Sequence, residues 1–194
     1  MRQRAKLGVS LVAVMAVGAY GLIGAQAAPQ EFRPFDAVLA GTSTAQPPVM
    51  GESSVTGTGT IRGTHIGNGT YSINAVQDYE RHEGEQEHPA GDCAFVEDND
   101  SNGLVITAAN GDQIFGNIDD DRSVVCVSEE TAGPGADAAY LSTLYVDVTG
   151  GTGRFTDAHG WIFVRGESTF TGSSPIVPPF TFSDEAVALG TIDY

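Results

Sequence analysis

The side chains best suited to acid–base chemistry lie in two segments that alternate polar and apolar residues, as β-strands do. The more polar faces of segments 140–149 and 160–171 together carry Tyr145, Asp147, Arg165 and Glu167. If the two segments are neighbouring strands, Asp147 or Glu167 would serve as a base while Tyr145 or Arg165 stabilises an oxyanion. The same residues also fit the commoner arrangement of an exposed cross-strand charge pair.

Two aromatic residues share a face with Arg165 and Glu167. Trp161 and Phe163 precede them at alternate positions, and period-2 alternation places all four on one side of the strand. If that side faces a cavity, the aromatic pair would contact a bound apolar molecule. Trp161 and Phe163 are therefore candidate ligand-binding residues.

Residues 98–103, Asp-Asn-Asp-Ser-Asn-Gly, have the spacing of the first half of a calcium-binding loop. The candidate ligands alternate along it: Asp98, Asp100 and Asn102. Gly103 holds the position of the sharp turn, but Ala109 stands where such loops carry a bidentate Glu, so an acid from 119–121 would have to complete the site. The alternative is a polar turn with Asn102 and Gly103 at its apex. Calcium is the one cofactor that the sequence suggests.

Net charge excludes several classes of function. Among 194 residues, 25 Asp and Glu face nine Lys and Arg, a formal charge of −16. No lysine follows Lys6, which excludes a Schiff-base lysine enzyme and a Walker-type phosphate loop. The acidity also argues against nucleic acid and anionic lipid, so the expected partner is a neutral or cationic molecule or a metal ion. Segment 78–100 is especially acidic and is typical of a solvated loop.

Residues 1–27 predict a secretory signal peptide. A basic start is followed by the apolar run 7–23 and by the small-x-small triplet that ends at Ala27, after which cleavage is expected. An uncleaved anchor is the alternative, since the run approaches the length that spans a bilayer. Cleavage would leave a single-domain extracellular or periplasmic protein with six arginines against 25 acids and no membrane association. In that setting Cys93 and Cys126, the only cysteines, would staple two neighbouring strands, or else remain as buried free thiols.

Residues 28–51 hold four prolines and are interpreted as an extended lead-in segment, with the folded domain spanning 52–194. Within that domain, runs of β-branched and aromatic residues are separated by Gly and Asn pairs, which is an all-β pattern with little helix. The predicted strands are 54–65, 70–79, 104–109, 112–118, 123–128, 140–149, 160–171 and 180–192. Turns are expected at 67–69 and 110–111. Eight antiparallel strands predict a closed barrel or a sandwich.

Residues 148–160, Val-Thr-Gly-Gly-Thr-Gly-Arg-Phe-Thr-Asp-Ala-His-Gly, resemble the Gly-Gly-Thr-Gly-(basic)-Phe-x-x-Ala-x-Gly signature of the allene oxide cyclase barrel-like and dirigent-like proteins. Residues 107–116 resemble a hairpin of the secreted bacterial members. The resemblance implies a single closed antiparallel eight-stranded β-barrel, often a homotrimer, whose interior holds an apolar small molecule and promotes cofactor-free cyclisation or coupling. In the motif, Phe155 would plug the core before the next strand begins.

Two functions follow from these observations. The first is a secreted barrel that binds a small apolar molecule and promotes its isomerisation or cyclisation without a cofactor. The second is a non-enzymatic exported barrel with an acidic, calcium-binding surface. An apolar cavity with two or three converging polar groups would support the first, and an interior filled by its own side chains would support the second.

Overall fold

The computed structural model describes residues 32–80, 93–99, 102–127, 139–172 and 178–194. Residues Glu31–Tyr194 form one compact unit. The predicted signal peptide and the alternative membrane anchor lie outside the described residues. Within the described ranges, no helix has the length and apolar character that a membrane span requires.

The fold is all-β, as the sequence predicts, and the described residues contain one short 3-10 turn and no α-helix. The 3-10 turn is η2 (Gly153–Phe155). The strands are β1 (Arg33–Ala45), β2 (Glu52–Gly63), β3 (Gly67–Asp78), β4 (Cys93–Asp98), β5 (Leu104–Thr107), β6 (Gln113–Ile118), β7 (Val124–Val127), β8 (Ala139–Gly151), β9 (His159–Phe170) and β10 (Phe180–Asp193).

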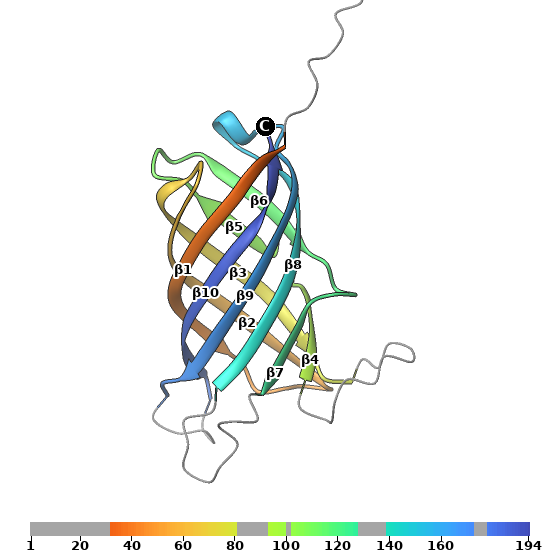
Figure 1. Ribbon diagram of the computed structural model, residues 1–194. Helices are drawn as coiled ribbons and strands as arrows, with labels where there is room; N and C mark the ends of the chain where they lie inside the picture. The colour runs from red at the N-terminus through yellow and green to blue at the C-terminus, as the bar shows by residue number, and fades with distance from the viewer. Residues whose placement is uncertain (1–31, 81–92, 100–101, 128–138, 173–177) are drawn as a thin grey trace, which may run out of the picture. The chain divides into compact units, whose positions relative to one another are not determined.

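The ten strands pair antiparallel, and their pairings form an eight-strand ring (Figure 1). Six long strands, β3–β2–β1–β10–β9–β8, make most of its circumference. Two short pairs join β3 to β8: β5 and β6 at one end of the ring, and β4 and β7 at the other. We call the first the hairpin end, which also holds η2 and the C-terminus, and the second the disulfide end.

The lead-in segment predicted at 28–51 contains a full strand of the ring. β1 pairs with β10 along its whole length and with β2 from Ala37 to Ala45. Its inward positions Phe35, Ala37 and Leu39 are buried, so the segment alternates as a strand even though prolines flank it. Pro34 lies near the first residue of the strand, where proline is tolerated. The folded unit therefore begins before residue 52.

β4 and the first turn also differ from expectation. β4 occupies part of the acidic segment expected to be a loop, because its three consecutive apolar residues Ala94, Phe95 and Val96 are buried where β4 pairs with β3 and β7. The turn between β2 and β3 is at 64–66 rather than 67–69, since Gly63 pairs with Gly67 and Ile66 is fully buried. The hairpin predicted at 110–111 is confirmed, with Thr107 opposite Gln113.

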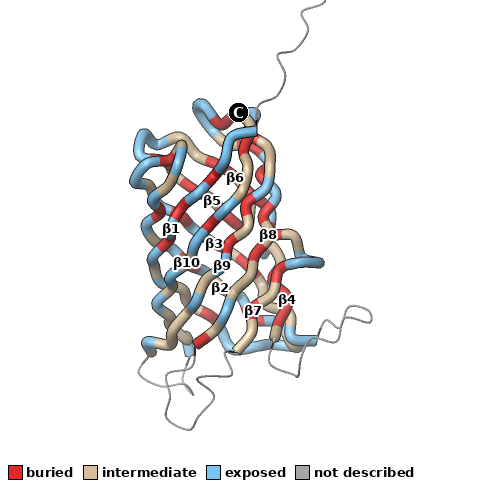
Figure 2. The backbone as a smooth tube through the Cα atoms, viewed as in Figure 1, coloured by how far each residue is buried: buried red, intermediate tan, exposed pale blue. Residues whose placement is uncertain are grey.

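The hairpin end is filled by a tightly packed apolar core, and buried positions recur along its strands (Figure 2). Its largest fully buried residues are Phe35, Ile61, Ile66, Ile106, Ile114, Val146, Phe155, Ile162 and Ile192. Phe155 in η2 is 0% exposed and its ring lies 4.8 Å from that of Tyr194, which confirms it as a plug. The glycine-rich reversal between β8 and β9 thus carries an anchor for the core.

The disulfide end carries a covalent cross-link between two strands. Cys93 of β4 and Cys126 of β7 are register partners with Cα atoms 4.0 Å apart, and their sulfurs are bonded. The predicted staple between neighbouring strands is therefore confirmed. Because β4 also pairs with β3 and β7 with β8, the disulfide joins the two short strands that complete the ring at this end.

Candidate functional site

The ring interior holds a cavity of about 120 Å³ toward the disulfide end. A wider mouth of about 710 Å³ lies next to it and shares five lining residues with it: Ser43, Val55, Gln77, Val125 and Ser168. A dry cavity of about 150 Å³ holds a molecule the size of benzene. The deep part therefore has room for one small ring or a short alkyl chain, and the mouth has room for the rest of a larger ligand.

A single row of register partners crosses this interior. The row, which we call the polar row, runs over β3, β2, β1, β10, β9 and β8 through Tyr71, Gly59, Gly41, Asp184, Ser168 and Tyr140. Tyr71, Ser168 and Asp184 line the deep cavity, and Tyr140 lines the mouth. Residues far apart in the chain thus meet at one level of the ring.

Two glycines allow Tyr71 to lie flat along this row. A Cβ on Gly59 would lie 2.6 Å from Cε1 of Tyr71, and a Cβ on Gly41 would lie 2.5 Å from its hydroxyl oxygen. Either contact is too close for a carbon atom, so only glycine leaves space for the ring. The Tyr71 side chain therefore extends over β2 and β1 and brings its hydroxyl to Gly41, the register partner of Asp184.

Asp184 is held inside the ring by β1. It lies in the inward phase of β10, which continues with Ala186 and Ala188, and the Ser43 hydroxyl donates a hydrogen bond of 3.0 Å to its Oδ1. Burial, and after it the charge of Asp184, raises the pKa of Tyr71 to about 12. At neutral pH the Tyr71 hydroxyl is therefore protonated and can donate a hydrogen bond.

The lining has no described cationic residue. Among the described residues that surround the deep cavity and the mouth, none is Lys, Arg or His. Next to Asp184, the inward-facing polar lining consists of neutral groups: Ser43, Tyr71, Gln77, Ser142 and Ser168. Glu167 and Glu185 also border the cavity, from exposed positions in the outward phase of β9 and β10. The rest of the deep cavity is mostly aliphatic. The site therefore combines apolar walls with one inward carboxylate and several hydroxyl groups.

Aromatic rings surround the mouth. The Phe182 ring lies 5.3 Å from that of Tyr140 and 5.8 Å from that of Phe170, both edge-on. Tyr79 donates a hydrogen bond of 2.9 Å from its hydroxyl to Oε1 of Gln77. A molecule entering from the mouth would pass these rings before it reached Asp184.

The residues predicted for acid–base chemistry share one face of two paired strands, as expected, but that face is the outer one. In β8 and β9, Tyr145 is opposite Phe163 and Asp147 is opposite Trp161, and the alternate positions Leu144, Val146, Ile162 and Val164 are buried. Arg165 and Glu167 lie farther along β9 and are exposed. The four residues therefore share the outward phase but are spread over successive rows of the two strands, since Arg165 is opposite Thr143 and Glu167 is opposite Leu141. Glu167 is the one member of the set that also borders the deep cavity.

The two aromatic candidates for ligand binding line a shallow outer groove. Trp161 is 49% exposed, and the Phe163 ring lies 5.0 Å from that of Tyr145. The guanidinium carbon of Arg122 lies 3.8 Å from the centre of the Tyr145 ring, a cation–π contact. The predicted ligand-binding role of Trp161 and Phe163 therefore refers to the outer surface rather than to the interior cavity.

The calcium-like segment forms a hydrogen-bonded turn in its described part. Oδ1 of Asp98 accepts the backbone N–H of Ile118 at 2.8 Å, and the backbone N–H of Asn102 donates to Oδ1 of Asn117 at 3.2 Å. Burial raises the pKa of Asp98, while hydrogen bonds from the amides of Ile118 and Gly103 act in the opposite direction. Asp100 lies outside the described residues. This geometry agrees with the polar-turn alternative and leaves calcium binding a prediction.

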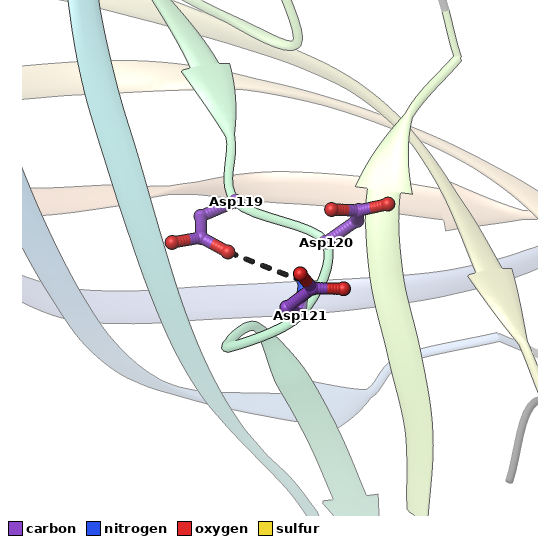
Figure 3. Close-up of side chains that lie close together, drawn as sticks. All are labelled: Asp119, Asp120 and Asp121. Carbon is purple, nitrogen blue, oxygen red and sulfur yellow. Dashed lines mark hydrogen bonds between the residues drawn. The ribbon is translucent and has the colours of Figure 1, made fainter. Parts of the chain in front are cut away.

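The acid triplet follows directly after β6. One side-chain oxygen from each of Asp119, Asp120 and Asp121 lies within 4.8 Å of the others (Figure 3). Asp119 accepts the backbone N–H of Asp121 at 3.2 Å and lies 3.6 Å from the guanidinium of Arg122. The negative charge of Asp120 also raises the pKa of Asp98. Completion of a calcium site by an acid of this triplet remains a prediction.

Sequence reasoning did not identify Tyr71, Ser43 or Asp184. Two signals in the sequence point to them. Asp184 is an acid in phase with Ala186, Ala188 and Ile192, the apolar face of its strand. The inward glycines Gly41 and Gly59 also leave space for a large side chain from a neighbouring strand.

Comparisons with known proteins assign no relative to this chain. No family model matches it, and neither the curated proteins nor the solved structures contain a match. The functional interpretation therefore rests on the residues and the geometry described above.

Proposed function

We propose that the ring is a closed β-barrel of the allene oxide cyclase-like or dirigent-like type and that its interior binds a small apolar molecule. One observation carries the proposal: Asp184 and Tyr71 converge, with Ser43, on a cavity whose other walls are mostly apolar. A pocket with apolar walls and a few placed polar groups is the usual form of a small-molecule site. The Phe155 plug supports the same assignment, because the resemblance predicted it.

The polar groups also suit a cofactor-free isomerisation or cyclisation. Asp184 would take a proton from one atom of the substrate and return it to another, while the Tyr71 hydroxyl donates to the oxygen that gains negative charge. Ser43 would act as a positioning residue through its hydrogen bond to Asp184. Such a reaction leaves the composition of the substrate unchanged and needs no external electron acceptor.

The proposed setting is the extracellular space or the periplasm, after signal-peptide cleavage. The disulfide between Cys93 and Cys126 supports it, because structural disulfides persist mainly in oxidising compartments. The alternative proposal, an acidic exported barrel that binds calcium, is supported by the three carboxylates at 119–121. In that case the acidic turns rather than the interior would carry the function.

Binding of a neutral apolar dye tests the first proposal. We expect Nile red to bind the purified protein saturably and with enhanced fluorescence. Ala186→Phe should abolish this signal by filling the deep cavity, whereas Ala40→Phe, on the exposed outer face of β1, should preserve it. Ser168→Phe supplies a second cavity-filling variant in case the first does not fold. Absence of saturable binding, or equal binding by the filled variants, would contradict an interior site.

A further inference from the structure

We infer that the interior ligand is a hydrophobic amine whose ammonium group pairs with Asp184. The inference rests on one part of the proposed function, the binding of a small molecule in the interior, and specifies its ligand class. It replaces the proton transfer proposed for Asp184. It concerns the charge of the ligand that the deep cavity favours.

The first argument is the unbalanced charge of the cavity. Asp184 points into a mostly apolar space, and the described lining residues include no cation. Its hydrogen bond from Ser43 supplies a dipole but no opposite charge. A carboxylate that lines a mostly apolar cavity gains most from a positively charged partner that also donates hydrogen bonds. A ligand that carries an ammonium group would supply what the described residues do not.

The second argument is the match in hydrogen-bonding capacity. An ammonium group has three N–H donors and no acceptor. The polar row surrounds Asp184 with oxygen atoms of Ser168 and Tyr71, and Ser43 and Gln77 add two more acceptors in the lining. A ligand carboxylate or phosphate would instead meet the like charge of Asp184, which disfavours anionic molecules.

The third argument is the route to the cavity. The rings of Tyr140, Phe170 and Phe182 lie at the mouth, and aromatic faces attract cations as well as apolar chains. The whole chain has a formal charge of −16, so its field favours the approach of cations over anions. The mouth and the deep cavity therefore select for the same kind of molecule.

Size limits the amine further. The deep cavity of about 120 Å³ admits a group near the size of one benzene ring, and longer substituents would occupy the mouth. An ammonium ion on Asp184 would occupy the carboxylate, so Asp184 would hold the ligand rather than transfer a proton. The inference thus favours a binding protein over an isomerase.

Three probes with a shared phenyl skeleton test the inference by isothermal titration calorimetry at neutral pH: phenethylamine, phenethyl alcohol and phenylacetate. We expect the amine to bind at least about tenfold more tightly than the alcohol, in line with a hydrogen bond to a charged group. Phenylacetate should bind most weakly. Asp184→Asn should remove the advantage of the amine and leave alcohol binding within about twofold. Asp36→Asn, the same substitution on the exposed outer face of β1, should change neither affinity.

The outcomes separate the inference from the function on which it rests. Equal affinity for the amine and the alcohol would overturn the amine assignment while interior binding, measured with Nile red, still stood. An amine preference that survives Asp184→Asn would overturn the role of Asp184. Binding of neither probe, together with loss of Nile red binding, would overturn both proposals. The ranking of the probes on the unsubstituted protein is decisive even if Asp184→Asn fails to fold.

Discussion

The hairpin end and the disulfide end are built from the same six long strands but differ in what those strands turn inward. In β1, the inward residues change from Phe35, Ala37 and Leu39 to glycine, serine and alanine. In β9 they change from Ile162 and Val164 to glycine and serine, followed by Phe170 at the mouth. One end is therefore packed with side chains, and the other retains a cavity. The comparison indicates that one continuous sheet can pack its interior tightly at one end and leave a cavity at the other.

Removing the Phe155 plug from the core should have the largest effect on stability. Phe155→Ala should lower the free energy of unfolding by about 3–5 kcal/mol, because it leaves a cavity among rigidly packed residues. Phe182→Ala, in the partly exposed aromatic mouth, should cost clearly less. Chemical denaturation of both variants measures the difference. Equal losses would show that the mouth contributes as much to stability as the plug does.

Loss of the disulfide should have the next largest effect on stability. It changes the disulfide end rather than the hairpin end. Replacing both Cys93 and Cys126 by Ala removes a cross-link between residues 33 positions apart. By chain entropy we expect a destabilisation of roughly 3–4 kcal/mol. Nile red affinity should fall as well, because Val96 of β4 and Val125 of β7 line the cavity. Phe155→Ala, matched to similar residual stability, serves as the control for binding. A loss of stability with unchanged Nile red affinity would separate the disulfide from the cavity.

The Tyr71 hydroxyl predicts a loss of stability at alkaline pH. Its pKa is raised from 10.0 to about 12 in the folded state, so the unfolded chain releases this proton first. The contribution of this group is therefore complete below about pH 10 and declines as pH rises toward 12. Tyr71→Phe should flatten the stability profile in that window, as measured by denaturation at several pH values. Tyr145→Phe, on the outer face, should leave the profile unchanged. An unchanged profile in Tyr71→Phe would show that other groups cause the alkaline loss.

Calcium should have the smallest effect. If the acid triplet binds calcium, an ion concentration ten times the dissociation constant would stabilise the fold by about 1.4 kcal/mol. The melting temperature should then rise in millimolar calcium and return with a chelator, and Asp120→Asn should remove the rise. Glu185→Gln, which changes charge equally on the outer face of β10, is the control. If calcium does not change the melting temperature, the triplet does not bind it and is only a polar turn.

The sequence predicted local features well because neighbouring residues determine them. The Asn110–Gly111 turn, the buried Phe155 and most strand centres follow from turn chemistry and alternation, and the Cys93–Cys126 pairing follows from there being only two cysteines. The strand β1 was missed because prolines and small residues hid its alternation. The candidate site was placed on the polar faces of β8 and β9, where the structure shows the outer surface.

By itself, the sequence determined the all-β class and an acidity that favours neutral or cationic partners. It predicted a bridge between its only two cysteines, with free thiols as the alternative, and the motif of the resemblance predicted the Phe155 plug. Only the tertiary structure decided which face of each strand points inward, because alternation defines two faces without saying which one closes around the core. It also decided that Tyr71 reaches toward Asp184 across Gly59 and Gly41. The proximity of Tyr71 and Asp184 depends on the pairing of β1 with β10. These strands lie at opposite ends of the folded unit in sequence, so no local pattern encodes their contact.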